Sequence, residues 1–235
     1  MMRRLEQAGH LDRQVEQLPD EPTLAEMVKA GQTLTRAELG VLLAYAKITL
    51  FDELLDSTVP DDDYLGRELF RYFPDEMAEA YGDEISGHRL RREIIATMLA
   101  NSMVNRGGPT FLTRLKDQTG ATTQDIANCF VAVRNSFDLT DHNNQIDALD
   151  ARIDGALQLE LYAKVQDLLL ERVIWFKRHV SFEQGMADVV DRFSRGIADL
   201  RPRLRTAVSD ALAEALDADS RRYEEAEKSY RTAIG

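Results

Sequence analysis

Four arginines at the two ends of one apolar stretch could bind an anion or contact a partner protein: Arg89, Arg91, Arg92 and Arg106. Guanidinium groups form paired hydrogen bonds with carboxylates and phosphates. The first three stand where a helix is expected to begin. Positive charge is unfavourable at the positive end of a helix dipole, so these arginines are expected to have a compensating contact. Plain salt bridges with neighbouring acids are one reason, and an effector site built around the four arginines is the other.

A row of polar side chains runs along the same stretch at a spacing of four residues: Thr97, Asn101 and Asn105. In a helix this spacing places them on one face. Buried amides must be hydrogen-bonded, and a buried polar row fixes the packing of a helix more often than it catalyses a reaction. We therefore interpret this row as structural.

Two glycines and a proline follow Arg106, and such a sequence can either cradle an anion or stop a helix. Gly107 suits the left-handed position that ends a helix, Gly108 gives the turn freedom, and Pro109 suits the first position of the next helix. We interpret Gly107, Gly108 and Pro109 as a helix stop.

The sequence contains no recognisable catalytic or cofactor-binding motif, and we assign no residue to either role. Gly82 and Gly87 have the glycine spacing of a phosphate-binding loop, but His88-Arg89 stands where that loop needs Lys and Ser or Thr. A Gly-x-Gly-x-x-Gly dinucleotide motif does not occur. Cys129 lies on the apolar face of its expected helix, so we interpret it as a core residue.

A metal site is not expected either. The four histidines are scattered and lack the spacing of metal ligands. The carboxylates at 61–63 follow Pro60 and suit the positive end of a helix dipole, whereas a calcium loop would need a glycine turn and a distal glutamate.

The elements that must position these residues are predicted to be helices. Glycine and proline are few, 13 and 6 respectively, and apolar residues recur every three or four positions. The sequence predicts an all-α, irregular bundle of about eight to ten helices with no sheet. A capping box at Thr35–Glu38 starts a long helix to about Leu55, which is apolar nearly all round and is therefore expected at the centre of the bundle.

Three regions are expected along the chain. Residues 1–33 form an N-terminal helical arm, whose first helix should run from Met2 to about Leu18. Residues 34–200 form the helical bundle, and residues 201–235 form a charged C-terminal helix or tail.

Composition and charge exclude several classes of protein. The net charge of -12 and the lack of a basic stripe argue against nucleic-acid binding. No apolar run is long enough to cross a bilayer, so no membrane partner is expected. One cysteine in 235 residues and no signal-peptide pattern predict a cytoplasmic protein.

Three stretches resemble the C-terminal region of the large bacterial NAD-specific glutamate dehydrogenases: residues 34–50 (LTRAELGVLLAYAKITL), 67–74 (RELFRYFP) and 88–111 (HRLRREIIATMLANSMVNRGGPTF). The resemblance is close over about residues 1–200 and loose after Pro202. In that family, the oxidative deamination of L-glutamate to 2-oxoglutarate belongs to an upstream domain with its own nucleotide-binding fold. The resemblance thus implies NAD as cofactor of the parent enzyme and none in this segment.

The first hypothesis is therefore a non-catalytic C-terminal domain that acts through interfaces, in assembly or regulation. Its expected partners are the remainder of its own enzyme subunit and further copies in a homo-oligomer. The alternative is a free-standing all-α adaptor or regulatory module that acts by protein–protein contacts.

Overall fold

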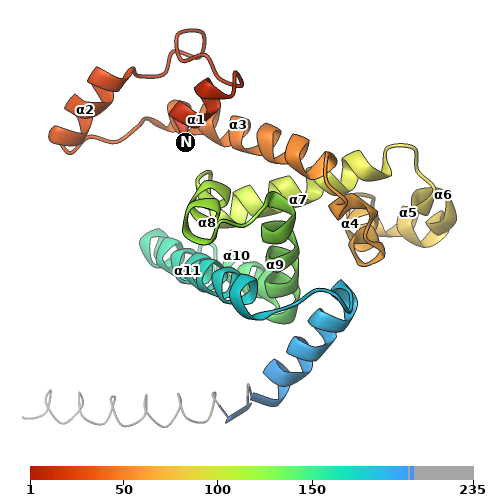
Figure 1. Cartoon of the computed structure of the whole chain (residues 1–235). Helices are drawn as coiled ribbons and strands as arrows, with labels where there is room; N and C mark the ends of the chain where they lie inside the picture. Colours follow the sequence, from red (N-terminus) through yellow and green to blue (C-terminus); the bar gives the residue numbers. More distant parts are fainter. Residues whose placement is uncertain (201, 204–235) are drawn as a thin grey trace, which may run out of the picture. The chain divides into compact units, whose positions relative to one another are not determined.

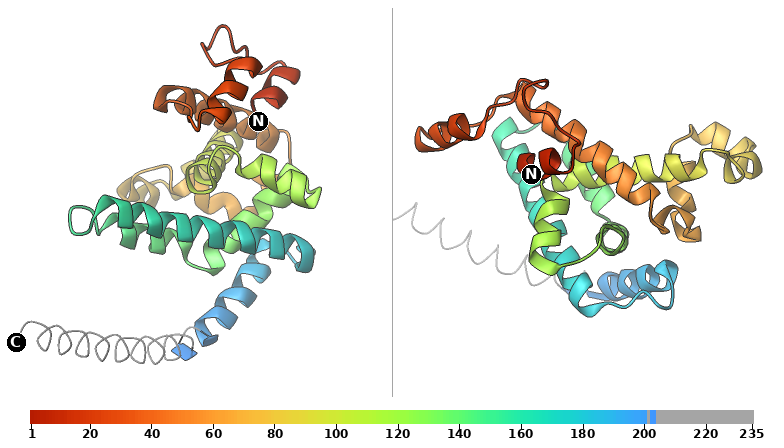
Figure 2. Two further views of the ribbon diagram at one scale, coloured as in Figure 1. Left: turned by 90° about the vertical axis from the view of Figure 1, so that its left-hand side faces the viewer. Right: turned by 45° about the horizontal axis from the view of Figure 1, so that its top comes forward.

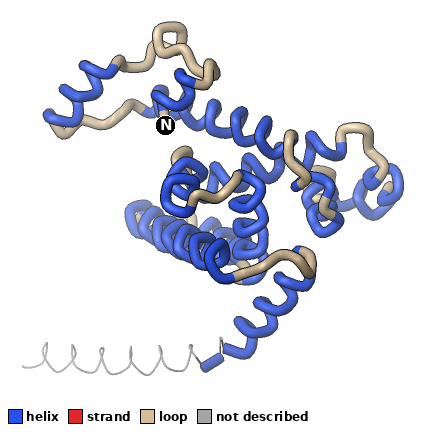
Figure 3. The backbone as a smooth tube through the Cα atoms, viewed as in Figure 1, coloured by secondary structure: helices blue, strands red, loops and turns tan. Residues whose placement is uncertain are grey.

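The computed structural model describes residues 1–200 and 202–203, and within them every regular element is a helix (Figure 3). This confirms the all-α class. Within the described residues, no helix is long and apolar enough to span a membrane. The elements are α1 (Met2–Gln7), α2 (Glu21–Lys29), α3 (Arg36–Leu55), the 3-10 helices η1 (Val59–Asp61) and η2 (Asp63–Leu65), α4 (Gly66–Phe70), α5 (Asp75–Ala80), α6 (Gly82–Ser86), α7 (Arg91–Gly107), α8 (Phe111–Thr119), α9 (Thr123–Ser136), α10 (Leu139–Asp147), α11 (Gly155–His179) and a helix at residues 186–200.

The chain divides into two compact units, Met1–Val190 and Asp191–Gly235. In the first unit α3 packs along α7, and the long helix α11 packs against α9 and α10 (Figures 1 and 2). The predicted tail at 201–235 lies outside the described residues, apart from 202 and 203.

The central helix of the first unit is α9, and the prediction that α3 would be central was wrong. Ten of the fourteen residues of α9 are buried, and this helix contacts α3, α7, α8, α10 and α11. In α3 the buried residues form a single row, whereas Leu39 and Ile48 are 46% and 53% exposed. An apolar helix surface is buried only where another element covers it, and α9 has more neighbours because it lies where the other helices converge.

The N-terminal segment turns back on itself, so the single helix expected from Met2 to Leu18 is also wrong. The helix ends at Gln7, and Gly9 follows with a φ of +74°. The turn brings Leu5, Leu11 and Leu18 together against Leu42 of α3. These leucines have a spacing that a helix would also satisfy, but a folded-back segment buries all three on one neighbour.

Capping boxes start two of the main helices. The Thr35 hydroxyl accepts from the Glu38 amide at 3.3 Å, and the Glu38 carboxylate accepts from the Thr35 amide at 2.6 Å. Thr122 and Asp125 do the same at the start of α9. Local sequence therefore determines where α3 and α9 begin, because each box satisfies amides that the first helical turn leaves free.

The joint between α7 and α8 uses its glycines differently from the expected way. Gly107 is the last helical residue, and Gly108 has the positive φ, +86° with ψ 166°. Gly107 is needed for space, because an added Cβ would lie 2.3 Å from Cγ of Phe111. Helix α8 begins at Phe111, so Pro109 lies in the turn before it rather than at its first position.

Candidate functional site

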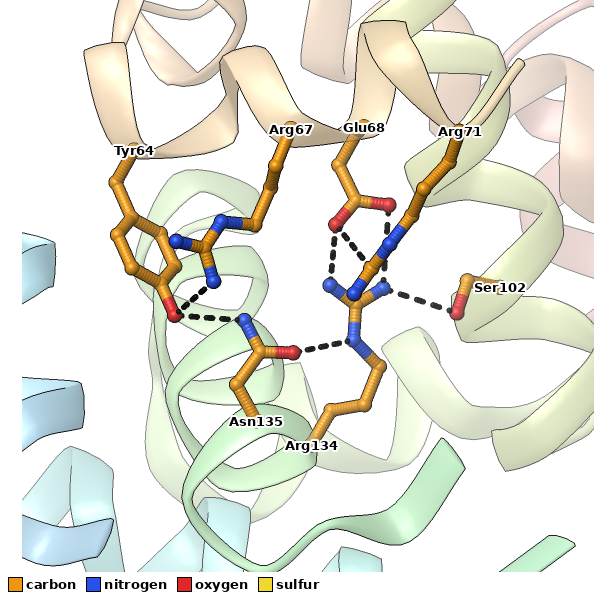
Figure 4. Close-up of polar contacts among 7 residues, drawn as sticks. All are labelled: Tyr64, Arg67, Glu68, Arg71, Ser102, Arg134 and Asn135. Atoms are coloured by element: carbon orange, nitrogen blue, oxygen red, sulfur yellow. Dashed lines mark hydrogen bonds and ion pairs between the residues drawn. The ribbon is translucent and has the colours of Figure 1, made fainter. Parts of the chain in front are cut away.

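A buried ion pair joins the short helix α4 to the central helix α9. Glu68 and Arg134 have side chains that are 3% and 7% exposed, and both carboxylate oxygens accept hydrogen bonds from the guanidinium (Figure 4). One of these bonds, from Nη1 to Oε2, measures 3.4 Å. Burying an unpaired charge would cost several kcal/mol, so the pair must form if α4 is to lie here.

Neighbouring side chains complete the hydrogen bonding of this pair. The Arg134 Nε donates to Asn135 at 3.0 Å, and its Nη1 reaches the Ser102 hydroxyl of α7 at 3.4 Å. Arg71, at the end of α4, donates to Glu68 at 2.9 Å and keeps its side chain 45% exposed. The cluster therefore connects α4, α7 and α9, and its charged groups are held by structural contacts.

A second chain of contacts runs beside the ion pair. The Tyr64 hydroxyl accepts from Arg67 at 2.9 Å and from Asn135 at 3.0 Å, and the Arg67 guanidinium lies 3.8 Å from the centre of the Tyr64 ring (Figure 4). Because Asn135 also accepts from Arg134, the two chains form one network. The network positions the first turn of α4 on the end of α9.

A cleft of about 560 Å³ adjoins the ion pair. Its walls come from the end of α4 and from α7, α9, α10 and α11. The polar and charged residues that line it are Glu68, Arg71, Asn101, Ser102, Asn105, Arg106, Arg134, Thr140, Asn143, Tyr162 and Gln166. A cleft of this size, lined by polar groups from several helices, can hold a small molecule.

The four arginines singled out in the sequence do not come together. Arg91 donates to the Pro60 carbonyl at 2.9 Å. Arg92 pairs with Asp61 and also donates to the Leu55 carbonyl at 2.7 Å, at the end of α3. Both therefore hold α7 to the loop after α3.

Arg106 lies at the opposite end of α7, about 22 Å from Arg91 at 1.5 Å per residue. It lines the cleft, whereas Arg89 is exposed on the turn before α7 and lies outside that cleft. The neighbours of Arg106 in the cleft are Arg71 and Arg134, which the sequence spacing does not relate to it.

The polar row of α7 is divided between two environments. Thr97 donates to the Glu93 carbonyl one turn earlier, at 2.7 Å. Asn101 and Asn105 line the cleft instead, Asn101 half-buried and Asn105 exposed, and neither side chain is hydrogen-bonded to a described residue.

Sequence reasoning missed Glu68 and Arg134. A usable signal existed for Arg134, because it is the only basic residue of α9 and directly follows the apolar run at 129–133. No such signal marks Glu68, which stands in a segment of alternating charge. Its burial depends on a partner 66 residues away.

The remaining candidates show no sign of chemistry. Cys129 is buried, and burial raises the pKa of its thiol to about 12, which suits a core residue. Asp61 is engaged by Arg92, and Asp62 accepts from the Tyr64 amide at 2.8 Å. The described residues contain no group of three or more side chains able to hold a metal ion.

Comparison with known proteins places the chain in a family. Residues 31–233 match the family described as Glutamate dehydrogenase, C-terminal. The NAD-specific glutamate dehydrogenase of Pseudomonas aeruginosa is 44% identical over 204 residues, which is 87% of this chain. The enzymes of the same name from Halomonas elongata and Mycobacterium tuberculosis are 40% and 32% identical, over 85% and 83% of this chain.

The chain spans only a small part of these relatives, 13% of the Pseudomonas protein and 12% of each of the other two. The three stretches that carry the resemblance form most of α3, α4 and α7; α3 and α4 both pack on α7, and η1 contacts α3 and α7. The chain belongs to the glutamate dehydrogenase C-terminal family.

Proposed function

We propose that this chain is a non-catalytic domain of an NAD-dependent glutamate dehydrogenase. The parent reaction would be the oxidative deamination of L-glutamate to 2-oxoglutarate, with NAD bound outside this chain and the enzyme in the cytoplasm. The names of the relatives support the reaction and the cofactor. In the described residues, the buried charges are engaged in structural contacts, which supports a role without chemistry.

The observation that carries an assembly role is the uncovered face of α3. Gly40, Ala44 and Ile48 follow one another at a spacing of four and are all exposed, and Leu43 and Phe51 beside them are only half-buried. Small residues at this spacing allow another backbone to approach closely, and an apolar helix face of this kind favours an interface.

The partner that we assign to this face is the remainder of the same subunit. The relatives are several times longer than this chain, so most of such a subunit lies outside the structure. A mainly apolar face, in which Lys47 is the one charged residue among these positions, suits a permanent contact within one polypeptide. Through it the domain would also help to build a homo-oligomer.

The test compares full-length enzymes carrying Ile48→Asp or Ala44→Asp with one carrying Val28→Asp. Val28 is 76% exposed on α2 and serves as the control for an added surface charge. The α3 variants are expected to lower both the oligomer fraction in analytical ultracentrifugation and the specific activity, with Val28→Asp unchanged. The same substitutions in the separate chain should leave its melting temperature within a few degrees.

Wild-type assembly and activity in both α3 variants would contradict the assembly role. Glutamate- and NAD-dependent turnover by the separate chain would contradict a non-catalytic one. An immunoblot of cells showing only a 26.6 kDa species would favour the free-standing adaptor instead.

A further inference from the structure

Arg106 is a cation without an ionic partner at the edge of the cleft. Its side chain is exposed and forms no hydrogen bond or ion pair with the described residues. Its charge acts on the neighbouring Tyr162: the hydrogen bond to Asp147 raises the pKa of that phenol, and Arg106 opposes the increase. The guanidinium therefore lies close to the cleft wall formed by α11.

The cleft has an excess of positive charge in an acidic chain. Three arginines and one glutamate line it, whereas the whole chain carries a net charge of -12. Glu68 is already shared between Arg134 and Arg71. A local positive excess inside a walled cleft attracts anions, because low-dielectric walls concentrate the field there.

Arg71 supplies a second set of donors. One of its nitrogens is used by Glu68, and its remaining N–H groups donate to no described residue. Arg71 donates to Glu68, Glu68 accepts from Arg134, and Arg134 reaches the Ser102 hydroxyl of α7. This chain of contacts places Arg71 near the middle of α7. Arg106 is one turn further along α7, about 6 Å from Ser102 in axial rise.

The lining between these two cations suits a short carbon chain. Met98, Leu139, Val165 and Leu169 contribute apolar surface, and the amides of Asn101 and Asn105 are free to donate. We propose that this cleft binds a short organic dicarboxylate, with one carboxylate on Arg71 and the other on Arg106. Planar guanidinium groups bind carboxylates through paired hydrogen bonds, so two arginines from different helices that line one cleft can each bind one carboxylate of the same ligand. This site does not depend on the proposed assembly role.

The probe is glutarate, a five-carbon dicarboxylate without a reactive group, titrated calorimetrically into the chain. Pentanoate, which has the same length and one carboxylate, and inorganic phosphate are the comparison ligands. Glutarate is expected to bind, to raise the melting temperature, and to bind at least tenfold more tightly than either comparison ligand.

The variants are Arg106→Gln and Arg71→Gln, with Arg114→Gln as the matched control. Arg114 is an exposed arginine of α8 that lies outside the cleft. Each cleft variant should weaken glutarate binding at least tenfold, and the control should bind like the wild type. Because the Arg106 side chain forms no hydrogen bond or ion pair with a described residue, Arg106→Gln without ligand should have the melting temperature of the wild type.

Three results would overturn the proposal. The first is no heat and no thermal shift with glutarate, and the second is equal binding of glutarate to the wild type and to Arg106→Gln. The third is binding of phosphate or pentanoate as tight as that of glutarate, which would show a site that does not recognise two carboxylates.

Discussion

The Glu68 carboxylate accepts hydrogen bonds from two nitrogens of Arg134 in a part of the molecule that water barely reaches. One side chain comes from a five-residue helix and the other from the central helix. The short helix α4 could not be stable by itself, because helix formation has a costly nucleus. The ion pair and its network hold α4 against α7 and α9.

Removal of one charge from this pair should destabilise the fold strongly. Glu68→Gln leaves Arg134 buried without a counter-charge, and we expect a loss of about 3 kcal/mol in the free energy of unfolding, measured with urea. Arg71→Gln leaves the pair intact and removes a largely exposed contact, so its loss should stay below about 1 kcal/mol. Equal losses in the two variants would contradict the assigned roles.

A methyl group at Gly107 should destabilise the joint between α7 and α8. Gly107→Ala places a carbon within 2.3–2.8 Å of three Phe111 side-chain atoms, and we expect a cost of about 1–3 kcal/mol. Gly40→Ala is the control, because it lies in a helix with no atom within 4 Å of the added Cβ. It should raise stability by about 0.5–1 kcal/mol. A neutral Gly107→Ala in thermal unfolding would show that Phe111 can move aside.

The Cys129 thiol should be unreactive until the protein unfolds. Burial raises its pKa to about 12, so at pH 8 only about one molecule in 10⁴ carries the thiolate. We expect no labelling by a disulfide reagent in the native state and complete labelling in guanidinium chloride. Fast labelling of the native protein at pH 8 would show that the α9 core opens readily.

Glu21 should titrate in strong acid. Its hydrogen bonds from Arg3 and Arg13, 2.6 and 2.7 Å long, lower the pKa of its carboxyl from 4.5 to about 2. Because the folded-state pKa is the lower one, the stabilisation is fully present above pH 4.5 and disappears as the pH falls through 2. A carboxyl NMR titration measures this pKa, and Arg3→Gln should raise it. A midpoint near 4.5 in the wild type would show that α2 is not held by these arginines.

Many of the helices could be predicted from the sequence, because where a helix begins and ends depends on residues close to one another in the chain. The capping box at Thr35 was predicted and is present, since a side chain three residues away satisfies the free amides. The second box, at Thr122 and Asp125, uses the same local signal. The stop after α7 was predicted too, but the positive φ is at Gly108 and not at Gly107, which is the last helical residue. The close approach of Phe111 to Gly107 is a packing contact that spacing alone does not reveal.

The candidate site was less readable. The sequence singled out Arg106 and grouped it with Arg89, Arg91 and Arg92, because all four border one helix. The structure groups it with Arg71 and Arg134, which come from other helices. The direction in which each side chain points around the α7 axis, and the packing of α4 and α9, decide which arginines share the cleft. Neither can be read from the spacing of residues along the sequence.

The sequence by itself determined the helical class, the main helix starts and stops, and the resemblance to the glutamate dehydrogenase C-terminal region. Those properties depend on periodicity, caps and turns within a few residues of one another. Only the tertiary structure decided that α9 is central, that Glu68 is buried on Arg134 and that three arginines share a cleft. Whether a side chain is buried, and which charge it pairs with, depends on which helices pack against one another. That packing is a property of the whole folded chain.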